Sequence, residues 1–384
     1  MRNRKILVIY VFLSFIMLEI LLRFQQKLGP LYDLEFNQIL SYSLSDTLNH
    51  IHSPGEYQYS IIIGSKRFNI KKCFDQNGIR VNKLIPHYPD DQMIFKILFM
   101  GDSFMEGFDD ENTIPYRIWQ NFQHKSLRNL KINFLNAGCS SYSPAVYIPQ
   151  AKLLIPQLKP DIVVIDIDES DLLDDSLKYK DCIVRNDSGD IIAVKYSSAQ
   201  SEFLNGFIKI KKYPLYIIRL PLKLCHTKIY PLLIDPNYRR IKSFSTLKIV
   251  YDRDKDAISK YAKEIEFFKK NLTELVRNLI NMMKDKRKIL FIYHSHPLRI
   301  QGDATGFYGN SFVSDTLKEV LNEQGISFYD ATGDLRSIFK NQLGRYYFRR
   351  DPVSHFNFEG MKIYSNLVAQ KLIPMIEVLV NEKK

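Results

Sequence analysis

Runs of consecutive apolar residues alternate along the chain with segments whose apolar residues recur every three or four positions. Unbroken apolar runs are typical of strands covered on both faces, and the three-to-four spacing is typical of helices with one buried face. The predicted strands cover residues 96–100, 133–138, 161–167, 288–294 and 326–330, and the predicted helices cover residues 113–125, 147–158, 256–284, 316–324 and 360–380. This alternation predicts an α/β fold with a mostly parallel sheet and helices on both of its faces.

The first apolar run is longer than the others. Residues 6–24 are almost wholly apolar, interrupted by Glu19 and Arg23. As a helix this run is about 28 Å long, close to the hydrocarbon thickness of a bilayer. Three basic residues precede it, Arg2, Arg4 and Lys5. Because positive residues stay on the cytoplasmic side, the sequence predicts a single-pass membrane anchor with the rest of the chain extracytoplasmic, in a periplasm or its equivalent. A cleaved signal peptide and a buried core helix are the alternatives.

The patterning divides the chain into four parts. Residues 1–27 form the cytoplasmic tip and the anchor, and residues 28–95 form a leader with two short strands and an Asn77-Gly78 turn signal. The main domain comprises residues 96–175 and 251–384, and residues 176–250 interrupt it. We expect the leader to pack on the edge of the main sheet.

The insertion has two different halves. Residues 182–194 form a hairpin pattern with a glycine in its turn, and residues 206–233 mix aromatic, aliphatic and basic side chains. The basic residues of this segment are Lys209, Lys211, Lys212, Arg219, Lys223 and Lys228. This composition suits a segment lying against an anionic membrane surface or a lid that faces carbohydrate, and an inserted subdomain with a basic solvated face is the alternative.

Charge and cysteine content narrow the class of protein. The 384 residues include 54 Lys and Arg against 42 Asp and Glu, a formal net charge of +12. This excess is spread along the chain, so it favours anionic surroundings over a nucleic-acid groove, and no nucleic-acid motif or Walker loop occurs. The cysteines, Cys73, Cys139, Cys182 and Cys225, have no metal-site or disulfide spacing. Free thiols are expected, with one or two disulfides as the alternative.

A candidate nucleophile follows the first strand of the main domain. The apolar run ends abruptly at Gly101, Asp102 and Ser103. Because ligands bind beyond the carboxyl ends of strands in open α/β sheets, Ser103 is predicted to lie where chemistry is usually done. The alternative is a turn in which Asp102 and Ser103 only cap the next helix.

The partners that an activated serine needs occur at other predicted strand and helix ends. Asp351 and His355 lie in one short loop before the last helix, and they supply an acid and a base. Gly138 and Ser170 follow the second and third strands, where a backbone N–H and a small polar side chain can stabilise an oxyanion.

These four blocks resemble those of SGNH (GDSL-type) hydrolases. The blocks are Gly101-Asp102-Ser103, Asn136-Ala137-Gly138, the acidic strand end at 168–171 and the His355 loop, with Tyr142-Ser143-Pro144 as in anchored extracytoplasmic members. The resemblance covers residues 96–375. It implies a flavodoxin-like three-layer α/β/α sandwich without metal or cofactor, Ser103 as nucleophile, His355 as base, and the N–H groups of Ser103 and Gly138 as oxyanion donors.

The chain departs from the family pattern at two positions. Ser170 stands where the third block usually has Asn, so the oxyanion hole has a shorter donor. Pro352 stands where the family has its Asp, and Asp351 is four residues before His355 instead of three. A triad completed by Asp351 and a dyad oriented by a backbone carbonyl both remain open.

Two further clusters carry polar groups. His294 and His296 could share a face at a strand end and bind a metal, or they could line the substrate cleft together with Asp102 and Asp171. Acidic residues crowd the third strand end at Asp166, Asp168, Asp171, Asp174 and Asp175. They could hold a divalent cation, but the pattern favours loop and helix N-terminal carboxylates that interact with the helix dipole.

The sequence therefore predicts a membrane-anchored serine esterase or acyltransferase of the SGNH type. Its substrate would carry an O-acyl group, most simply O-acetyl, on a cell-envelope polysaccharide or glycolipid or on another acylated small molecule. No nucleic-acid partner is expected. The alternatives are a catalytically weak scaffold that binds a glycan or an envelope partner, and a lipase or lysophospholipase.

Overall fold

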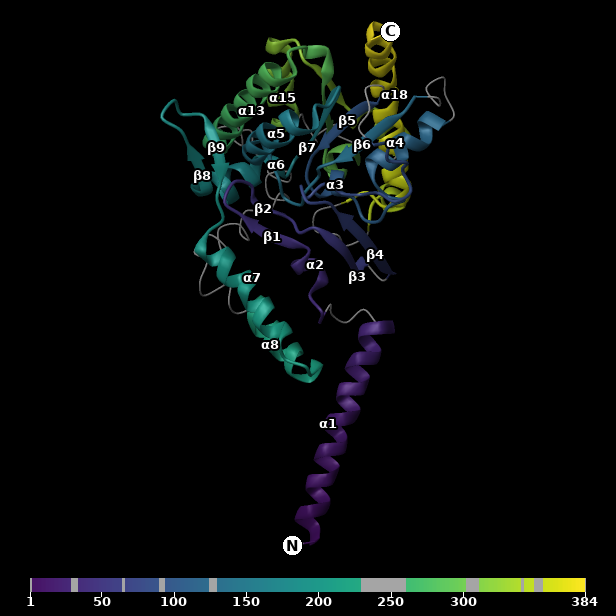
Figure 1. The fold of residues 1–384 in the computed structure, drawn as a ribbon, viewed down its shortest axis with the longest axis vertical. Coiled ribbons are helices and arrows are strands. Elements are labelled where there is room, and N and C mark those ends of the chain that lie inside the picture. The colour runs from purple at the N-terminus through teal and green to yellow at the C-terminus, as the bar shows by residue number, and fades with distance from the viewer. Residues whose placement is uncertain are drawn as a thin grey trace.

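The structure is a computed structural model of the chain, shown in Figure 1. It describes residues 2–28, 34–63, 66–89, 94–123, 130–228, 260–301, 311–339, 342–348 and 355–383. A rounded body carries one long helix, α1 (Arg2–Leu28), which projects from it as a stem.

A five-stranded parallel sheet forms the centre of the body. Its strands are β5 (Phe95–Met100), β6 (Ile132–Asn136), β7 (Ile162–Asp168), β10 (Ile289–His294) and β11 (Ser327–Asp330). They lie in the order β11-β10-β7-β5-β6, and all four neighbouring pairs are parallel. In chain order this is 2-1-3-4-5, the flavodoxin-like order, whose direction reverses beside β5. The predicted fold class is confirmed.

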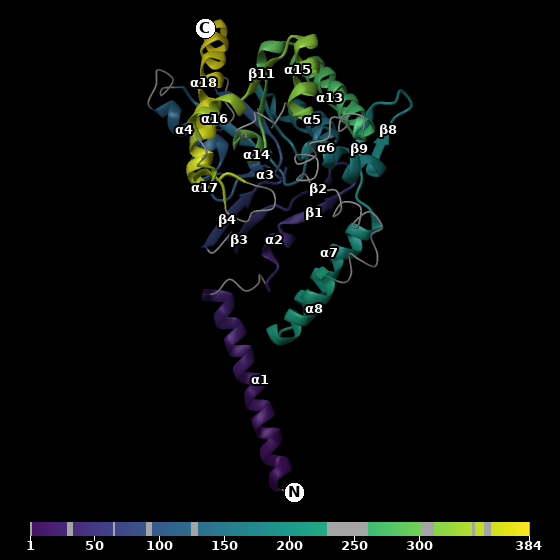
Figure 2. The ribbon, with the colours of Figure 1, turned by 180° about the vertical axis from the view of Figure 1, so that it is seen from behind.

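Helices cover both faces of this sheet (Figure 2). One face carries α5 (Pro144–Leu158), α13 (Ala262–Met283) and α15 (Phe312–Gln324), and the other carries α4 (Ile114–Gln123), α16 (Thr332–Phe339), α17 (Leu343–Tyr346) and α18 (Phe358–Lys383). Alternate residues of β5 point to opposite faces, so Leu98 belongs to the first core and Ile97 and Phe99 belong to the second. This explains why the strands read as unbroken apolar runs.

Among the residues that the structure describes, two helices are long and apolar enough to cross a membrane. Residues Ile6–Phe24 of α1 have a mean hydropathy of 2.4 and none of that window is buried, whereas half of the window in α18 is buried in the core. The buried helix α18 is a core helix of the α/β sandwich. The exposed helix α1 is the one that fits the predicted anchor.

The leader lies against the β6 edge of the sheet. It contains α2 (Asn37–Leu40), the hairpin of β1 (Tyr42–Ser45) and β2 (Asn49–His52), and the hairpin of β3 (Gly55–Ile63) and β4 (Lys66–Phe74). Arg80 forms antiparallel bridges to both Phe74 and Asn136, so its backbone joins β4 to β6. The Asn77-Gly78 signal is a turn in which Gly78 has a φ of +72°.

The described part of the insertion runs to Lys228. A π-helical turn (Asp174–Tyr179) follows the short helix α6 (Asp171–Leu173), and β8 (Ile183–Arg185) and β9 (Ile191–Val194) form the predicted hairpin. The basic aromatic segment then forms two helices, α7 (Ser198–Lys211) and α8 (Tyr216–Lys228), which lie at the same end of the body as α1 (Figures 1 and 2).

Candidate active site

The candidate nucleophile lies where the polypeptide leaves β5 and enters the short helix α3 (Ser103–Glu106). Asp102 caps this helix, since its Oδ1 atom accepts the N–H of Phe104 at 2.8 Å. Gly101 has no room for a side chain, because a Cβ atom there would lie 2.6 Å from Cβ of Met105. The turn therefore presents Ser103 at the carboxyl end of the sheet, half-buried and beside the point where the strand order reverses.

The structure brings Ser103 and His355 together across the chain. The Oγ atom of Ser103 lies 2.8 Å from Nε2 of His355, and 3.2 Å from Oδ2 of Asp102. The imidazole ring packs beside Phe104 at 4.7 Å between ring centroids and beside Phe108 at 5.8 Å. A histidine held in this way can accept the serine proton, so the pair has the geometry that nucleophilic catalysis needs.

Buried carboxylates surround this pair. Burial and the neighbouring Asp168 raise the pKa of Asp102 well above its ordinary value. Burial also raises the pKa of Asp168, and the nearby His355 opposes that rise. A proton that moves from Ser103 to His355 would place a positive charge on the imidazole ring near these carboxyl groups. Asp168, which the sequence places in the acidic third block, is thus a neighbour of the histidine.

Gly138 has a clear steric role. A Cβ atom there would lie 2.4 Å from the backbone N of Glu106, so only glycine lets the loop after β6 pass this close to α3. Its N–H donates to Oδ1 of Asn136 at 3.0 Å. In this arrangement the side chain of Asn136 accepts the N–H that the sequence predicts as an oxyanion donor.

Ser170 and Asp171 also have internal partners. The hydroxyl of Ser170 donates to Oδ1 of Asp168 at 2.7 Å, and its N–H donates to the same atom. Asp171 is 1% exposed and its Oδ2 accepts the N–H of Asp168 at 2.7 Å. The side chain of Asp171 therefore bonds the backbone at the end of β7 instead of facing a substrate. The hydroxyl proton of Ser170 is already donated to Asp168.

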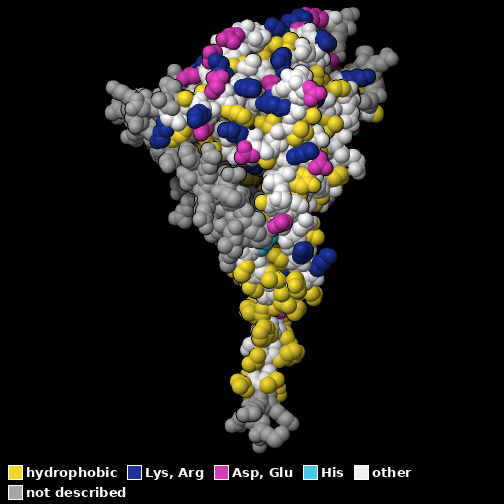
Figure 3. All heavy atoms as spheres, turned by 90° about the vertical axis from the view of Figure 1, so that its left-hand side faces the viewer, with side chains coloured by type: hydrophobic (Ala, Val, Ile, Leu, Met, Phe, Trp, Pro, Cys, Tyr) yellow, Lys and Arg dark blue, Asp and Glu magenta, His cyan; other side chains and the backbone are white. Residues whose placement is uncertain are grey.

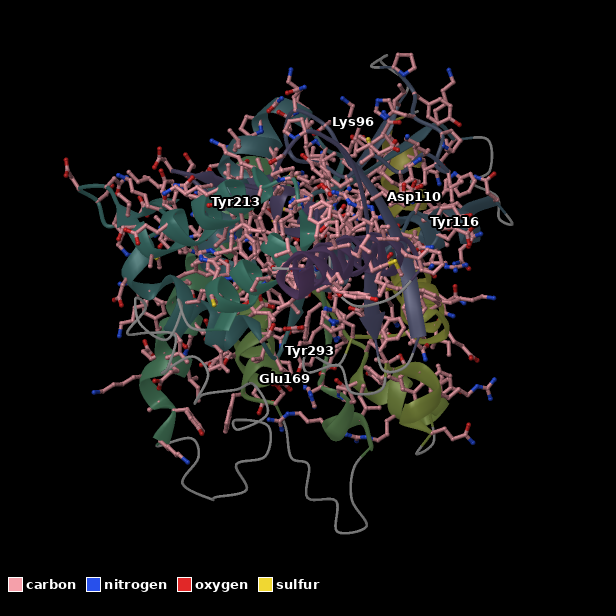
Figure 4. The ribbon with its side chains drawn as sticks, turned by 90° about the horizontal axis from the view of Figure 1, so that it is seen from below. Lys96, Asp110, Tyr116, Glu169, Tyr213 and Tyr293 are labelled. Carbon is pink, nitrogen blue, oxygen red and sulfur yellow. The ribbon has the colours of Figure 1, made fainter. Side chains whose placement is uncertain are left out.

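His294 and His296 follow β10 at the same edge of the sheet. Both are buried, and burial lowers the pKa of His294 to about 3 and of His296 to about 4. The His294 ring lies 4.2 Å from the Phe104 ring, which keeps it close to the serine–histidine pair. Neighbouring Tyr293 donates to Glu169 at 2.7 Å, and Figure 4 shows these two side chains together.

Some predicted features are not described by the structure or have no counterpart in it. Asp351 lies outside the described residues, and so does Pro352. Within the described ranges, no group of three His, Cys, Asp or Glu side chains is arranged to hold a metal ion. Four acidic residues at the β7 end are bonded to backbone, hydroxyl and amide groups of the protein: Asp166, Asp168, Asp171 and Asp175.

A second buried cluster supports the nucleophile turn from behind, and sequence reasoning did not find it. Glu106, at the end of α3, is 2% exposed, forms an ion pair with Lys72 and accepts the Tyr42 hydroxyl at 3.1 Å. Its Oε2 atom also accepts the N–H of Ser140 at 3.0 Å and lies 3.4 Å from Nε2 of His52. Glu106 therefore ties the leader and the loop after β6 to the nucleophile helix.

The strand order and the pairing of Ser103 with His355 agree with the SGNH hydrolase type that the four sequence blocks resemble. The structure thus defines a flavodoxin-like α/β domain with a serine–histidine pair at its switch point. Searches of protein-family models and of curated proteins give no match.

Several solved structures are similar to the chain, all at low identity. A two-domain esterase active on acetylated mannans has a TM-score of 0.38 and 10% identity, over 75% of this chain and 50% of that one. A catalytic mutant of an acetylxylan esterase from Geobacillus stearothermophilus has a TM-score of 0.40 and 14% identity, over 73% and 94%. A lipase/acylhydrolase from Enterococcus faecalis has a TM-score of 0.37 and 13% identity, over 72% and 95%. At these values the similarities carry no argument about activity.

Proposed function

We propose that this protein is a serine esterase or acyltransferase that acts on O-acyl groups, most simply O-acetyl groups, of a cell-envelope polysaccharide or glycolipid. One observation carries the proposal: the 2.8 Å contact between Ser103 Oγ and His355 Nε2 at the carboxyl end of β5. Helix α1 would hold the domain next to the envelope as a single-pass anchor, with the catalytic domain outside the cytoplasm.

In the proposed mechanism Ser103 attacks the acyl carbonyl while His355 accepts its proton at Nε2. The negative charge that develops on the carbonyl oxygen is stabilised by the N–H of Ser103 at the start of α3. His355 then returns the proton to the departing sugar oxygen, which leaves an acyl group on Ser103. Water or a second sugar hydroxyl, deprotonated by His355, attacks this acyl group and restores the free serine.

The proposal is tested with a fluorophosphonate probe on the full chain in detergent, with intact mass as the readout. We expect the probe to label the native protein, Ser103→Ala to abolish labelling, and His355→Ala to slow it by about a thousandfold or more, as expected when the base of such a pair is removed. An acetylated sugar should compete for labelling. Equal labelling of the native protein and the Ser103→Ala variant would overturn the mechanism.

A second candidate function rests on the two candidate oxyanion donors that already form hydrogen bonds within the protein. The hydroxyl of Ser170 and the N–H of Gly138 both donate within the protein, which favours a weak oxyanion site and a scaffold that binds a glycan or an envelope partner without vigorous turnover. A Ser170→Asn variant separates the two functions. A large gain in esterase rate would mark the native site as deficient, and a loss of rate would mark Ser170 as suited to its own substrate.

A further inference from the structure

The insertion helices α7 and α8 form a hairpin with a firmly held turn. Arg219 is 8% exposed and donates to the carbonyl oxygens of Tyr213 at 2.6 Å and Lys211 at 2.8 Å. The same guanidinium pairs with Glu35 at 2.9 Å and bonds the carbonyl of Leu34. One buried arginine therefore fixes both sides of the turn and ties it to the residues that follow the anchor.

The hairpin is also bonded to the anchor itself. Glu19, the single acid within the apolar run of α1, accepts the N–H of Tyr216 at 3.1 Å and of Ile217 at 2.9 Å. These are orphan donors at the start of α8, and a carboxylate is the group that a helix N-terminus prefers. Arg23 completes the contact by donating to the carbonyl of Pro214 at 2.9 Å while its guanidinium lies over the Tyr216 ring. Glu19 and Arg23, the two charged residues in the apolar run of α1, are thus both bonded to the hairpin.

These bonds set the depth of the turn relative to a bilayer. The apolar window of α1 ends at Phe24. Glu19 is five residues earlier, which is about 7 Å along a helix. A turn bonded to Glu19 therefore lies level with the last part of the membrane span. In Figures 1 and 2 the lower end of the hairpin indeed reaches below the upper end of α1.

The side chains around the turn suit this depth. Tyr213 and Leu215 in the turn are 46% and 43% exposed, and Ile218 on α8 is 37% exposed. Figure 3 shows hydrophobic side chains gathered where the body meets the stem, in continuity with those of α1. Lys209 and Lys212, close to the turn, are exposed and basic. Apolar tips flanked by lysines are typical of segments that lie in the interface of an anionic membrane.

We propose that the α7–α8 turn is a second membrane contact, which inserts Tyr213 and Leu215 into the bilayer interface beside α1 while its lysines face anionic phospholipid headgroups. The inference rests on the proposed anchoring by α1 and is independent of the esterase chemistry. Two contacts would fix the tilt of the body on the membrane. The active site would then keep one distance and orientation relative to the bilayer surface.

The single tryptophan of the chain allows a direct test. Trp119 lies on α4 in the body, away from α1 (Figure 1). The full chain is reconstituted in vesicles of phosphatidylcholine and phosphatidylglycerol, with or without acyl-brominated phosphatidylcholine as quencher. Three proteins are compared: the native chain, and Trp119→Phe chains that carry either Phe12→Trp in α1 or Tyr213→Trp in the turn.

We expect tryptophan at position 213 to lose about half of its fluorescence, because interfacial segments bury about 5–10 Å into the headgroup and acyl boundary. Position 12 should be quenched more strongly, and Trp119 should be unaffected. Leaving out phosphatidylglycerol should weaken quenching at position 213 only. Quenching at position 12 with none at 213 would overturn the hairpin contact, and no quenching at either would overturn the anchor as well.

A charge-neutral variant tests the bond between anchor and hairpin. Glu19→Gln should reduce quenching at position 213 by about half, because two helix donors lose their carboxylate, and it should leave position 12 unchanged. Glu323→Gln on α15, an exposed position in the body, is the matched control and should change neither. If quenching at position 213 were the same in Glu19→Gln as in Glu323→Gln, Glu19 would not be the residue that holds the hairpin on α1. Fluorophosphonate labelling reports the esterase separately.

Discussion

The most completely paired side chain near the candidate site belongs to Glu106. Burial alone would raise the pKa of this carboxyl, but Lys72 and His52 beside it hold the pKa well below its ordinary value. A folded-state pKa that is depressed means that the charged form stabilises the fold above the ordinary carboxyl pKa, and that this contribution is lost as the pH falls through the folded-state value. At the residue scale, the nucleophile turn therefore depends on an ionised glutamate supplied with partners by the leader.

Replacing this glutamate should be costly. Glu106→Gln leaves the buried Lys72 ammonium without its counter-charge, so we expect the free energy of unfolding at pH 7 to fall by about 3–5 kcal/mol. The double variant Lys72→Met, Glu106→Gln should recover part of this loss, because the unpaired charge is gone. Urea unfolding of all variants measures both effects. The difference between native and Glu106→Gln proteins should shrink below pH 4.5, and a constant difference would contradict the assigned ionisation.

The chemistry-bearing residues fall into two groups by how well the sequence predicts them. Ser103 is predictable because the end of an apolar run locates it, and His355 because it lies just before a helix in a polar loop. Glu106 is not predictable, because its partners Lys72 and His52 come from leader strands whose polar residues look solvent-facing in the sequence. The N–H of Gly138 is predicted as an oxyanion donor from its place at a strand end and from the resemblance, and only the structure shows that Asn136 accepts it.

At the scale of elements, the site depends on how closely two strand ends approach. The N–H of Cys139 donates to the carbonyl of Gly101 at 3.0 Å, and Asn136 donates to the carbonyl of Met105 at 2.9 Å. The loop after β6 is thus bonded along the whole nucleophile turn. Sheet order could be predicted from the alternation of strands and helices, but this close approach depends on a glycine whose role no local pattern indicates.

Closing the gap between these elements should disable the site. In Gly138→Ala the added Cβ would meet the backbone of Glu106 and Met105 at 2.4 and 2.7 Å, so α3 or the loop must move. We expect a loss of about 1–3 kcal/mol in stability, as for other overpacked positions, and a fluorophosphonate labelling rate reduced at least tenfold. Gly333→Ala in α16 is the control, because a Cβ there meets nothing within 4 Å. A Gly138→Ala protein that labels like this control would contradict the argument.

At the scale of the molecule, Arg80 is a second link between the leader and the main domain, besides the partners of Glu106. Its N–H bonds the carbonyl of Asn136 at 2.8 Å, and its guanidinium donates to the carbonyls of Glu106 and Gly107. The sequence predicts that the leader packs on the sheet edge. That one of its arginines holds the backbone of the nucleophile helix could not be predicted, because the contact depends on tertiary packing.

Removing this arginine should loosen the leader and the active site together. Arg80→Met leaves the carbonyls of Glu106 and Gly107, at the end of α3, without this donor, which costs about 1–3 kcal/mol for each unsatisfied group. We expect hydrogen exchange to accelerate in β4, in α3 and in the loop after β6, with α13 and α15 unchanged, and labelling of Ser103 to slow in parallel. Arg277→Met is the matched control, because Arg277 is exposed and pairs only with Asp190 on the surface, where an ion pair contributes about 0–1 kcal/mol. If Arg80→Met accelerated exchange in the leader but left α3 and labelling as in the control, the leader would be a covering layer, and the nucleophile turn would hold its geometry without it.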